Sequence, residues 1–206
     1  MNQVSTGKKA IRRPGGRTAD VTERVHQAIV EIIVEGGCEA CTVSAVAKRA
    51  GVERSTLYRR YPDRWAAIIE TWMTRVAADV MPDIGDSFAD DLRSILRRLV
   101  VVLESPLGPA LLNVAAELRA RRGTFPEGFF DRRMTQLAPM FESAIGRGEL
   151  PADVDREGLF SFAAGPLYFR MFIACREVDH AFIDMIVDNV CRLYCLPAVP
   201  LSPRLS

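Results

Sequence analysis

Three arginines and three hydroxyl-bearing side chains lie within the seven residues 54–60, Arg-Ser-Thr-Leu-Tyr-Arg-Arg. A guanidinium presents a planar fork of N–H donors that fits a guanine edge or a phosphate group, and hydroxyl and methyl groups can contact other base edges. Leu57 is the one aliphatic residue that could anchor this run to a core. The residue types therefore suit recognition of base edges and phosphates, with an ordinary solvated helix as the alternative.

Two short helices joined by a glycine turn are expected to position these groups. Thr42 is a suitable N-cap for the first helix, whose apolar face has the i, i+3, i+4, i+7 spacing and consists of Val43, Val46, Ala47 and Ala50. Gly51 can adopt the left-handed conformation that ends a helix, and the second helix is expected at about Arg54 to Tyr61. The stretch 42–64 is thus predicted to be a helix-turn-helix, and its basic outward face favours a DNA-binding surface.

Helices on either side should hold this unit rigid. A preceding helix is predicted from an apolar repeat that stops at Gly36-Gly37 and comprises Val21, Val25, Ala28, Ile29, Ile32 and Ile33. Asp63 can cap a following helix that reaches about Val80. Arg64 then lies in a first turn, where free N–H groups and a guanidinium would suit a DNA phosphate; the alternative is a surface arginine paired with Asp63 or Glu70.

Residues 11–80 resemble the DNA-binding domain of the tetracycline-repressor (TetR) family. The likeness rests on a basic arm (Arg12, Arg13, Pro14, Gly15, Gly16, Arg17), the Thr42 cap, Ala-Gly-Val at 50–52, Thr-Leu-Tyr at 56–58 and Tyr-Pro-Asp-Arg at 61–64. Trp65 departs from the acidic residue that is common after this corner. The resemblance implies an operator-binding regulator.

The expected DNA contacts follow from these motifs. Arg54, Thr56, Arg59 and Arg60 are assigned to bases, and Thr42, Tyr58 and Arg64 chiefly to phosphates. Arg13 and Arg17 of the arm could enter a minor groove, although a purely solubilising tail fits equally well. The full set of candidates is Arg13, Arg17, Thr42, Ser44, Lys48, Arg54, Ser55, Thr56, Tyr58, Arg59, Arg60, Tyr61 and Arg64.

The charge of the chain is unevenly distributed. The formal net charge is only +1, but residues 1–64 hold 12 Lys and Arg against 7 Asp and Glu, and residues 65–206 hold 15 against 19. The basic charge therefore lies with the helix-turn-helix. The basic start of the chain has no apolar core of a signal peptide, and no apolar run approaches the ~18 residues of a membrane span, so a soluble, cytoplasmic protein is expected.

The sequence offers little for catalysis or metal binding. It has two histidines, no G-x-S-x-G elbow and no phosphate-binding loop, so no catalytic residue, cofactor or enzymatic activity is predicted. His26 lies off the apolar repeat and is expected at the surface. Cys38 and Cys41 have C-x-x-C spacing without a second ligand pair, which favours core or turn residues over a metal site; Cys191 and Cys195 should share one face of the last helix.

The rest of the chain is predicted to be helical. Helices are expected at about residues 87–103, 109–121, 126–147, 153–174 and 179–193, with no competing strand pattern. The expected fold is all-α, with about nine helices: an N-terminal three-helix DNA-binding domain with a helix-turn-helix, then a larger helical ligand-binding and dimerisation domain. The boundaries are 1–17 (arm), 18–64 (DNA binding), 65–80 (connecting helix), 81–196 (effector binding and dimerisation) and 197–206 (irregular tail).

The last two helices are apolar over much of their circumference, so they are either central to the core or form an oligomer interface. Residues 165–170, Gly-Pro-Leu-Tyr-Phe-Arg, resemble the penultimate helix of a TetR-family subgroup, and the family usually dimerises through its last two helices. A dimer would also place two DNA-reading helices ~34–36 Å apart, one turn of DNA. The candidate interface residues are Phe162, Leu167, Phe169, Met185, Ile186 and Cys191.

Apolar residues between these regions could line an effector pocket or simply fill a core. The candidates are Leu99, Leu103, Leu111, Phe129, Leu137, Phe141, Phe160, Tyr168 and Phe172. The leading interpretation is a homodimeric repressor that a small, largely apolar ligand releases from a palindromic operator. The alternatives are a helical scaffold or small-molecule-binding protein without DNA binding, and an enzyme acting on hydrophobic metabolites.

Overall fold

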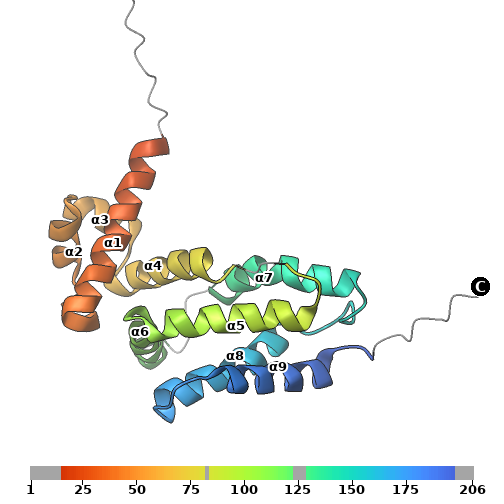
Figure 1. Ribbon diagram of the computed structural model, residues 1–206. Helices are drawn as coiled ribbons and strands as arrows, with labels where there is room; N and C mark the ends of the chain where they lie inside the picture. Colours follow the sequence, from red (N-terminus) through yellow and green to blue (C-terminus); the bar gives the residue numbers. More distant parts are fainter. Residues whose placement is uncertain (1–14, 82–83, 123–128, 198–206) are drawn as a thin grey trace, which may run out of the picture. The chain divides into compact units, whose positions relative to one another are not determined.

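The computed structural model describes residues 15–81, 84–122 and 129–197, and every regular element in these ranges is a helix (Figure 1). The all-α prediction is confirmed. The elements are α1 (Gly15–Ala40), α2 (Val43–Ala50), α3 (Arg54–Arg60), α4 (Arg64–Asp79), α5 (Phe88–Glu104), α6 (Leu107–Arg122), α7 (Phe129–Gly146), α8 (Arg156–Tyr168), a π-helical turn η1 (Phe169–Ile173) and α9 (His180–Tyr194).

The chain forms two compact units, one ending at Thr71 and the other beginning at Trp72. The division falls inside α4, so this helix contributes residues to both units. The first unit contains α1, α2, α3 and the start of α4; the second contains the remainder of α4 and all later helices.

Helix α1 contributes one long apolar face to the core of the first unit. Its predicted apolar repeat is buried at Val25, Ala28, Ile29, Ile32 and Ile33, which are all at most 6% exposed. At the glycine pair where the helix was predicted to stop, Gly37 has a φ of 71° and interrupts the helical conformation, and α1 resumes after this kink and ends at Ala40. Cys38, in the last turn of α1, and Cys41, just after the helix, are both buried.

Two expectations about α1 were wrong. The helix begins at Gly15, inside the segment predicted to be a mobile arm. Arg13 lies outside the described residues, and for Arg17 the structure describes the backbone alone. His26 was expected at the surface but is 1% exposed. It lies three residues before Ile29 on the edge of the apolar face, so the buried arc of α1 is wider than the repeat indicated.

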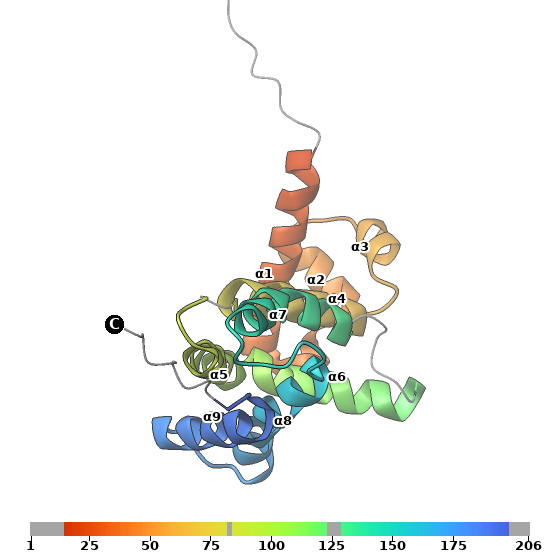
Figure 2. The same ribbon diagram turned by 90° about the vertical axis from the view of Figure 1, so that its right-hand side faces the viewer.

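Helix α5 is the centre of the second unit. It packs against α6, α7, α8 and α9, with α7 on one side of it and the α8–α9 pair on the other (Figures 1 and 2). Its N-terminus is capped by Ser87, whose hydroxyl accepts from the Asp90 N–H at 3.2 Å. Leu92, Ile95 and Leu96 are fully buried, as a helix surrounded by neighbours requires.

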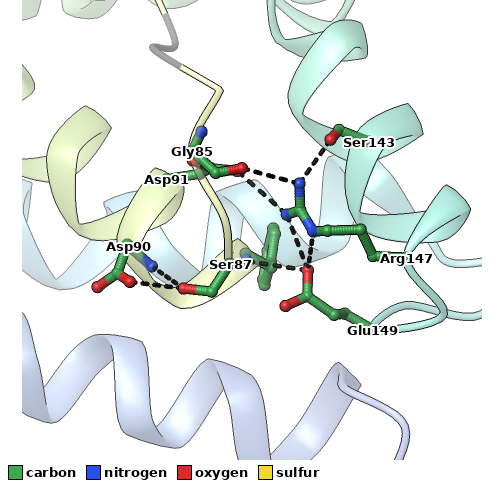
Figure 3. A network of polar contacts seen from close by, with 8 residues as sticks. Gly85, Ser87, Asp90, Asp91, Ser143, Arg147 and Glu149 are labelled. Atoms are coloured by element: carbon green, nitrogen blue, oxygen red, sulfur yellow. Dashed lines mark hydrogen bonds and ion pairs between the residues drawn. The ribbon is translucent and has the colours of Figure 1, made fainter.

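A polar network fixes the segment before α5 to the end of α7 (Figure 3). Asp91, 2% exposed, accepts from the Gly85 N–H at 2.6 Å and pairs with Arg147 at 3.3 Å. Arg147 also donates to the Gly85 carbonyl and to Glu149, and Glu149 accepts from the Phe88 N–H at 3.0 Å. The buried carboxylate therefore has both a charged and a backbone partner.

The predicted helices differ from the observed ones mainly near prolines and glycines. Helix α6 begins at Leu107, two residues before the predicted start, because Pro109 is tolerated in a first turn, where its missing N–H is not needed. Helix α8 ends at Tyr168 and continues as η1, whereas one helix to 174 was expected. Pro166 removes one backbone donor just before this change.

Within the described ranges, no single helix is long and apolar enough to cross a membrane, and one bent pair, α5 with the first part of α6, meets the length and composition criteria together. Among these same residues, no three His, Cys, Asp and Glu side chains are grouped so as to hold a metal ion.

Candidate nucleic-acid interface and apolar cavity

Helices α2 and α3 form the predicted helix-turn-helix. The Thr42 hydroxyl accepts from the Ala45 N–H at 3.1 Å and caps α2. Gly51 ends α2 in the left-handed conformation, with φ 64° and ψ 43°, and the Val52 N–H then donates to the Ala47 carbonyl at 3.0 Å. Val46, Ala47 and Ala50 are buried, whereas Val43 is half-buried. The local signals in the sequence thus determine this turn.

Helix α3 is held by a single buried side chain, Leu57, which is 4% exposed. At ~100° per residue, Arg54, Tyr58, Ser55 and Arg59 share an arc of about 140° that excludes Leu57; Arg54 lies at the end of the arc nearer to Leu57, and Thr56 lies beyond the other end. Tyr58 is 60% exposed, and Arg54, Ser55 and Arg59 are also exposed. Neither Arg54 nor Arg59 makes a hydrogen bond or an ion pair with another residue that the structure describes. Both guanidiniums are available to a partner.

Arg60 has a different environment from Arg59. It lies three residues after Leu57, as Arg54 lies three before, but the contacts of its guanidinium place it on the protein side of α3. Its guanidinium donates to the Thr22 hydroxyl of α1 and pairs with Glu70 of α4 at 2.7 Å. The prediction that Arg60 contacts bases is not supported by this geometry, because the guanidinium joins α3 to its neighbours.

Tyr61 was predicted to contact DNA, but its side chain is 3% exposed. Its hydroxyl lies 3.4 Å from His26 Nε2 and 3.5 Å from Glu70 Oε1. Burial, and then the negative charge of Glu70, raise the pKa of Tyr61 to about 12, so the phenol stays protonated and can donate. Tyr61 is part of the core of the first unit, so the prediction that it contacts DNA was wrong.

Arg64 has a partner that the sequence did not suggest. Asp63 caps α4 by accepting from the Ala66 N–H at 2.9 Å, as predicted. The Arg64 guanidinium stacks over the Trp65 ring at 4.2 Å and pairs with Glu39 at 3.2 Å. The Glu39 side chain is 85% exposed, so this pair contributes little and a phosphate could replace the carboxylate.

The polar side chains of α2 also divide into those paired within the protein and those without an ion pair. Arg49 pairs with Glu35 at 2.6 Å and with Glu31 at 3.4 Å, both on α1. Lys48 is exposed and makes no ion pair within the described part of the chain. Thr42 is exposed and Ser44 half-buried. The cations left uncommitted by the fold of α2 and α3 are therefore Lys48, Arg54 and Arg59.

The second unit contains an apolar cavity of about 340 Å³. Four of the predicted pocket residues line it: Leu99, Leu111, Phe160 and Tyr168. Trp72 of α4 also lines it. The other lining residues were not predicted and are Leu112, Ala115, Phe130, Arg133, Ser161, Ala164 and Gly165.

The other predicted pocket residues lie elsewhere. Leu103, Leu137 and Phe141 are at most 1% exposed and belong to the core around α5. Phe172 of η1 contacts the Tyr168 ring at a centroid distance of 6.3 Å but does not line the cavity. Phe129 begins α7, and its side chain lies outside the described part. Helical spacing identified apolar positions but could not separate the lining of a cavity from a filled core.

An apolar surface covers the last elements of the chain. Phe162 of α8 is 45% exposed and Met185 of α9 is 47% exposed, as interface candidates should be. Phe169 of η1 is 63% exposed, and Ile173 and Leu193 are exposed too although they were not predicted. Cys191 is half-buried. Leu167 and Ile186 were wrongly assigned to the interface, because they are 0% and 3% exposed and pack inside the unit.

A helix-turn-helix with an exposed basic second helix, followed by a helical unit with an apolar cavity, defines the class of helix-turn-helix transcriptional regulators. Residues 26–66 match the family model described as bacterial regulatory proteins, tetR family, and residues 81–190 match the tetracyclin repressor-like C-terminal domain. The chain belongs to the TetR family and is a DNA-binding transcriptional regulator.

Relatives and solved structures agree with this assignment. The chain is 28% identical over 188 residues to the uncharacterized HTH-type transcriptional regulator YdeS of Bacillus subtilis, covering 84% of this chain and 90% of YdeS. It is 25% identical over 166 residues to the DNA-binding transcriptional repressor TetR of Mycobacteroides abscessus, covering 78% and 86%. The crystal structure of the TetR family transcription regulator SCO0332 matches with a TM-score of 0.68 and 25% identity, covering 84% of this chain and 97% of that one.

Proposed function

We propose that this regulator is a homodimeric repressor that binds a palindromic operator and leaves it when a small, largely apolar ligand enters the cavity of the second unit. The observation that carries the proposal is the combination of uncommitted cations on α3 with a cavity that Trp72 of α4 lines. A regulator with this role must reach the chromosome, so we expect it in the cytoplasm, as in the bacteria of its relatives.

The set of residues proposed to contact DNA is smaller than the set predicted from the sequence. Arg54 and Arg59 would bond base edges, with Thr56 at the edge of the same surface. Thr42, Ser44, Lys48, Ser55 and Tyr58 would contact phosphates or the groove walls, joined by Arg64 after exchange of Glu39 for a phosphate. Arg60 and Tyr61 would support α3 from within the first unit.

The proposed dimer interface is the apolar surface of α8, η1 and α9. Phe162, Phe169, Ile173, Met185 and Leu193 are between 45% and 71% exposed, which is costly for a monomer in water. A two-fold interface uses the same patch on both copies, so one such surface is sufficient for a closed dimer. Two copies would present two α3 helices to one operator.

Release requires that the ligand bind the non-operator conformation more tightly, since equal affinity for both conformations shifts nothing. Helix α4 provides a route. Its residue Glu70 pairs with Arg60 of α3, and Trp72, two residues later, lines the cavity. A ligand that displaces Trp72 would therefore act on the helix that holds α3. Repression rather than activation is supported by the relative from Mycobacteroides abscessus, which is described as a repressor.

The test is binding of the purified protein to DNA fragments from its own promoter and from neighbouring promoters at a series of salt concentrations. Six to ten phosphate contacts predict a loss of about 10³–10⁵ in affinity between 50 and 200 mM salt. Footprinting should show two half-sites about 10 bp apart. Arg54→Ala should relax the sequence preference, whereas Arg49→Ala, which removes a cation already paired on α1, should leave the footprint unchanged.

Absence of salt-sensitive binding to any fragment would contradict the proposal and favour the alternative, a small-molecule-binding scaffold without DNA binding. Binding to a site without two-fold symmetry would retain DNA recognition but remove the dimer.

A further inference from the structure

The cavity contains one buried cation. Arg133 of α7 lines it and is 4% exposed, although its neighbours Asp131 and Arg132 are exposed. The other lining side chains are apolar or neutral, among them Trp72, Phe160 and Tyr168. A charged group is seldom buried to this extent without a partner of opposite charge.

Arg133 has few partners for its five N–H donors. Nη1 donates to the Val80 carbonyl at 3.4 Å and to Gln136 Oε1 at 3.5 Å, which are both long for hydrogen bonds. The guanidinium also lies over the Phe160 ring, 5.4 Å from its centroid. Nη2 is buried without a hydrogen-bond partner, and Arg133 forms no ion pair with any residue that the structure describes.

Burial disfavours the positive charge of Arg133, but the guanidinium stays protonated. Desolvation lowers the pKa of Arg133 from 12.5 to about 10, and the nearby Tyr168 offsets this only in part. The guanidinium is therefore still protonated at neutral pH. A structural role as a cap for the end of α4 would use one donor toward the Val80 carbonyl, and a neutral side chain could serve it at lower cost.

We propose that Arg133 is an anion-binding residue and that the effector is an amphipathic acid, with a carboxylate paired to Arg133 and an apolar body among Trp72, Phe130 and Phe160. This inference rests on the proposed effector cavity and specifies its ligand. A guanidinium binds a carboxylate through two parallel N–H···O bonds, which uses the donors that the fold leaves unpaired. The volume of about 340 Å³ suits a small molecule.

The experiment compares acids with their neutral amides of the same shape. The probes are 2-naphthoate with 2-naphthamide and octanoate with octanamide, and binding to the full chain is measured by calorimetry at neutral pH. A charge-assisted bond to a buried guanidinium predicts that at least one acid binds about tenfold or more tightly than its amide.

Two variants test whether Arg133 causes the preference for acids over amides. Arg133→Met replaces the cation with an apolar side chain of similar length and should abolish the preference for the acid while amide affinity stays within about threefold. Arg133→Lys keeps the charge without the planar fork and should retain part of the preference. Circular dichroism confirms that each variant is folded, and unchanged amide binding shows that the cavity is intact.

The inference is overturned if no acid binds more tightly than its amide, or if Arg133→Met keeps the preference. If amides bind and release the operator as well as acids do, the proposed function holds and the anion site fails. If the acids bind through Arg133 but the protein has no operator, the anion site holds and the repressor proposal fails.

Discussion

Arg59 and Arg60 are adjacent on α3, and the structure predicts opposite consequences for their loss. Arg59 is exposed and makes no ion pair within the described residues, so Arg59→Ala removes nothing from the fold. If Arg59 bonds a base, its loss costs about 1–3 kcal/mol, or roughly 5- to 150-fold in operator affinity. The free energy of unfolding should change by less than about 0.5 kcal/mol.

Arg60→Ala acts on the fold instead. It breaks the ion pair with Glu70, in which the two side chains are 38% and 34% exposed, and the hydrogen bond to Thr22. A partly exposed pair contributes up to about 1 kcal/mol, and a hydrogen bond contributes about as much again. We therefore expect a loss of roughly 1–2 kcal/mol in the free energy of unfolding.

The assays are urea unfolding and fluorescence anisotropy with a labelled operator. Arg60→Ala also releases the negative charge of Glu70 beside the DNA surface, so the matched control is the double variant Arg60→Ala, Glu70→Ala, which removes both charges. Its operator affinity should stay within about threefold of the wild type. The reasoning is refuted if the double variant Arg60→Ala, Glu70→Ala weakens operator binding as much as Arg59→Ala does.

Three further outcomes are expected. Phe169→Glu should shift the protein from dimer to monomer in analytical ultracentrifugation, whereas Val101→Glu, at a 67% exposed apolar position on α5, should not. Asp91→Ala should lower the free energy of unfolding, measured in urea, by roughly 2–4 kcal/mol, because it removes the buried carboxylate that bonds Arg147 and the Gly85 N–H. The control Asp90→Ala, at an exposed position, should lower it by about 1 kcal/mol or less. Cys175 should react with a disulfide reagent at once, whereas Cys41, which is 1% exposed with a pKa raised by burial to about 12, should react only on unfolding; early labelling of Cys41 would contradict this.

The sequence predicted the helix-turn-helix well because its signals are local. Thr42, Gly51 and Asp63 each act on backbone groups within a few residues, and the structure shows each in the predicted role. Ser87 also caps a helix by a local hydrogen bond, although the sequence pattern predicted only that a helix starts near this residue. Capping and left-handed glycines need no knowledge of the tertiary fold.

The sequence could not separate Arg59 from Arg60, because the difference comes from distant residues. The partners of Arg60 are Thr22, 38 residues earlier, and Glu70, 10 residues later. His26 was misplaced for the same reason: its burial depends on Tyr61, which packs against it from 35 residues away. An arginine or histidine on a helix gives no local sign of what will cover it.

Arg133 was not predicted to line the pocket, because pocket linings are expected to be apolar and a charged residue on a helix is expected to face water. Its lowered pKa, from 12.5 to about 10, corresponds to roughly 3 kcal/mol of unfavourable desolvation. A carboxylate ligand that pairs with Arg133 would recover part of this free energy, close to the Val80 carbonyl that Arg133 Nη1 contacts one residue beyond the end of α4. Couplings of about 1–3 kcal/mol are typical of allosteric proteins. Only the part of the Arg133–carboxylate interaction that differs between the operator-bound and the released conformation would contribute to release, and the contact of Arg133 with Val80 at the end of α4, the helix that carries Glu70 and Trp72, is where such a difference would arise.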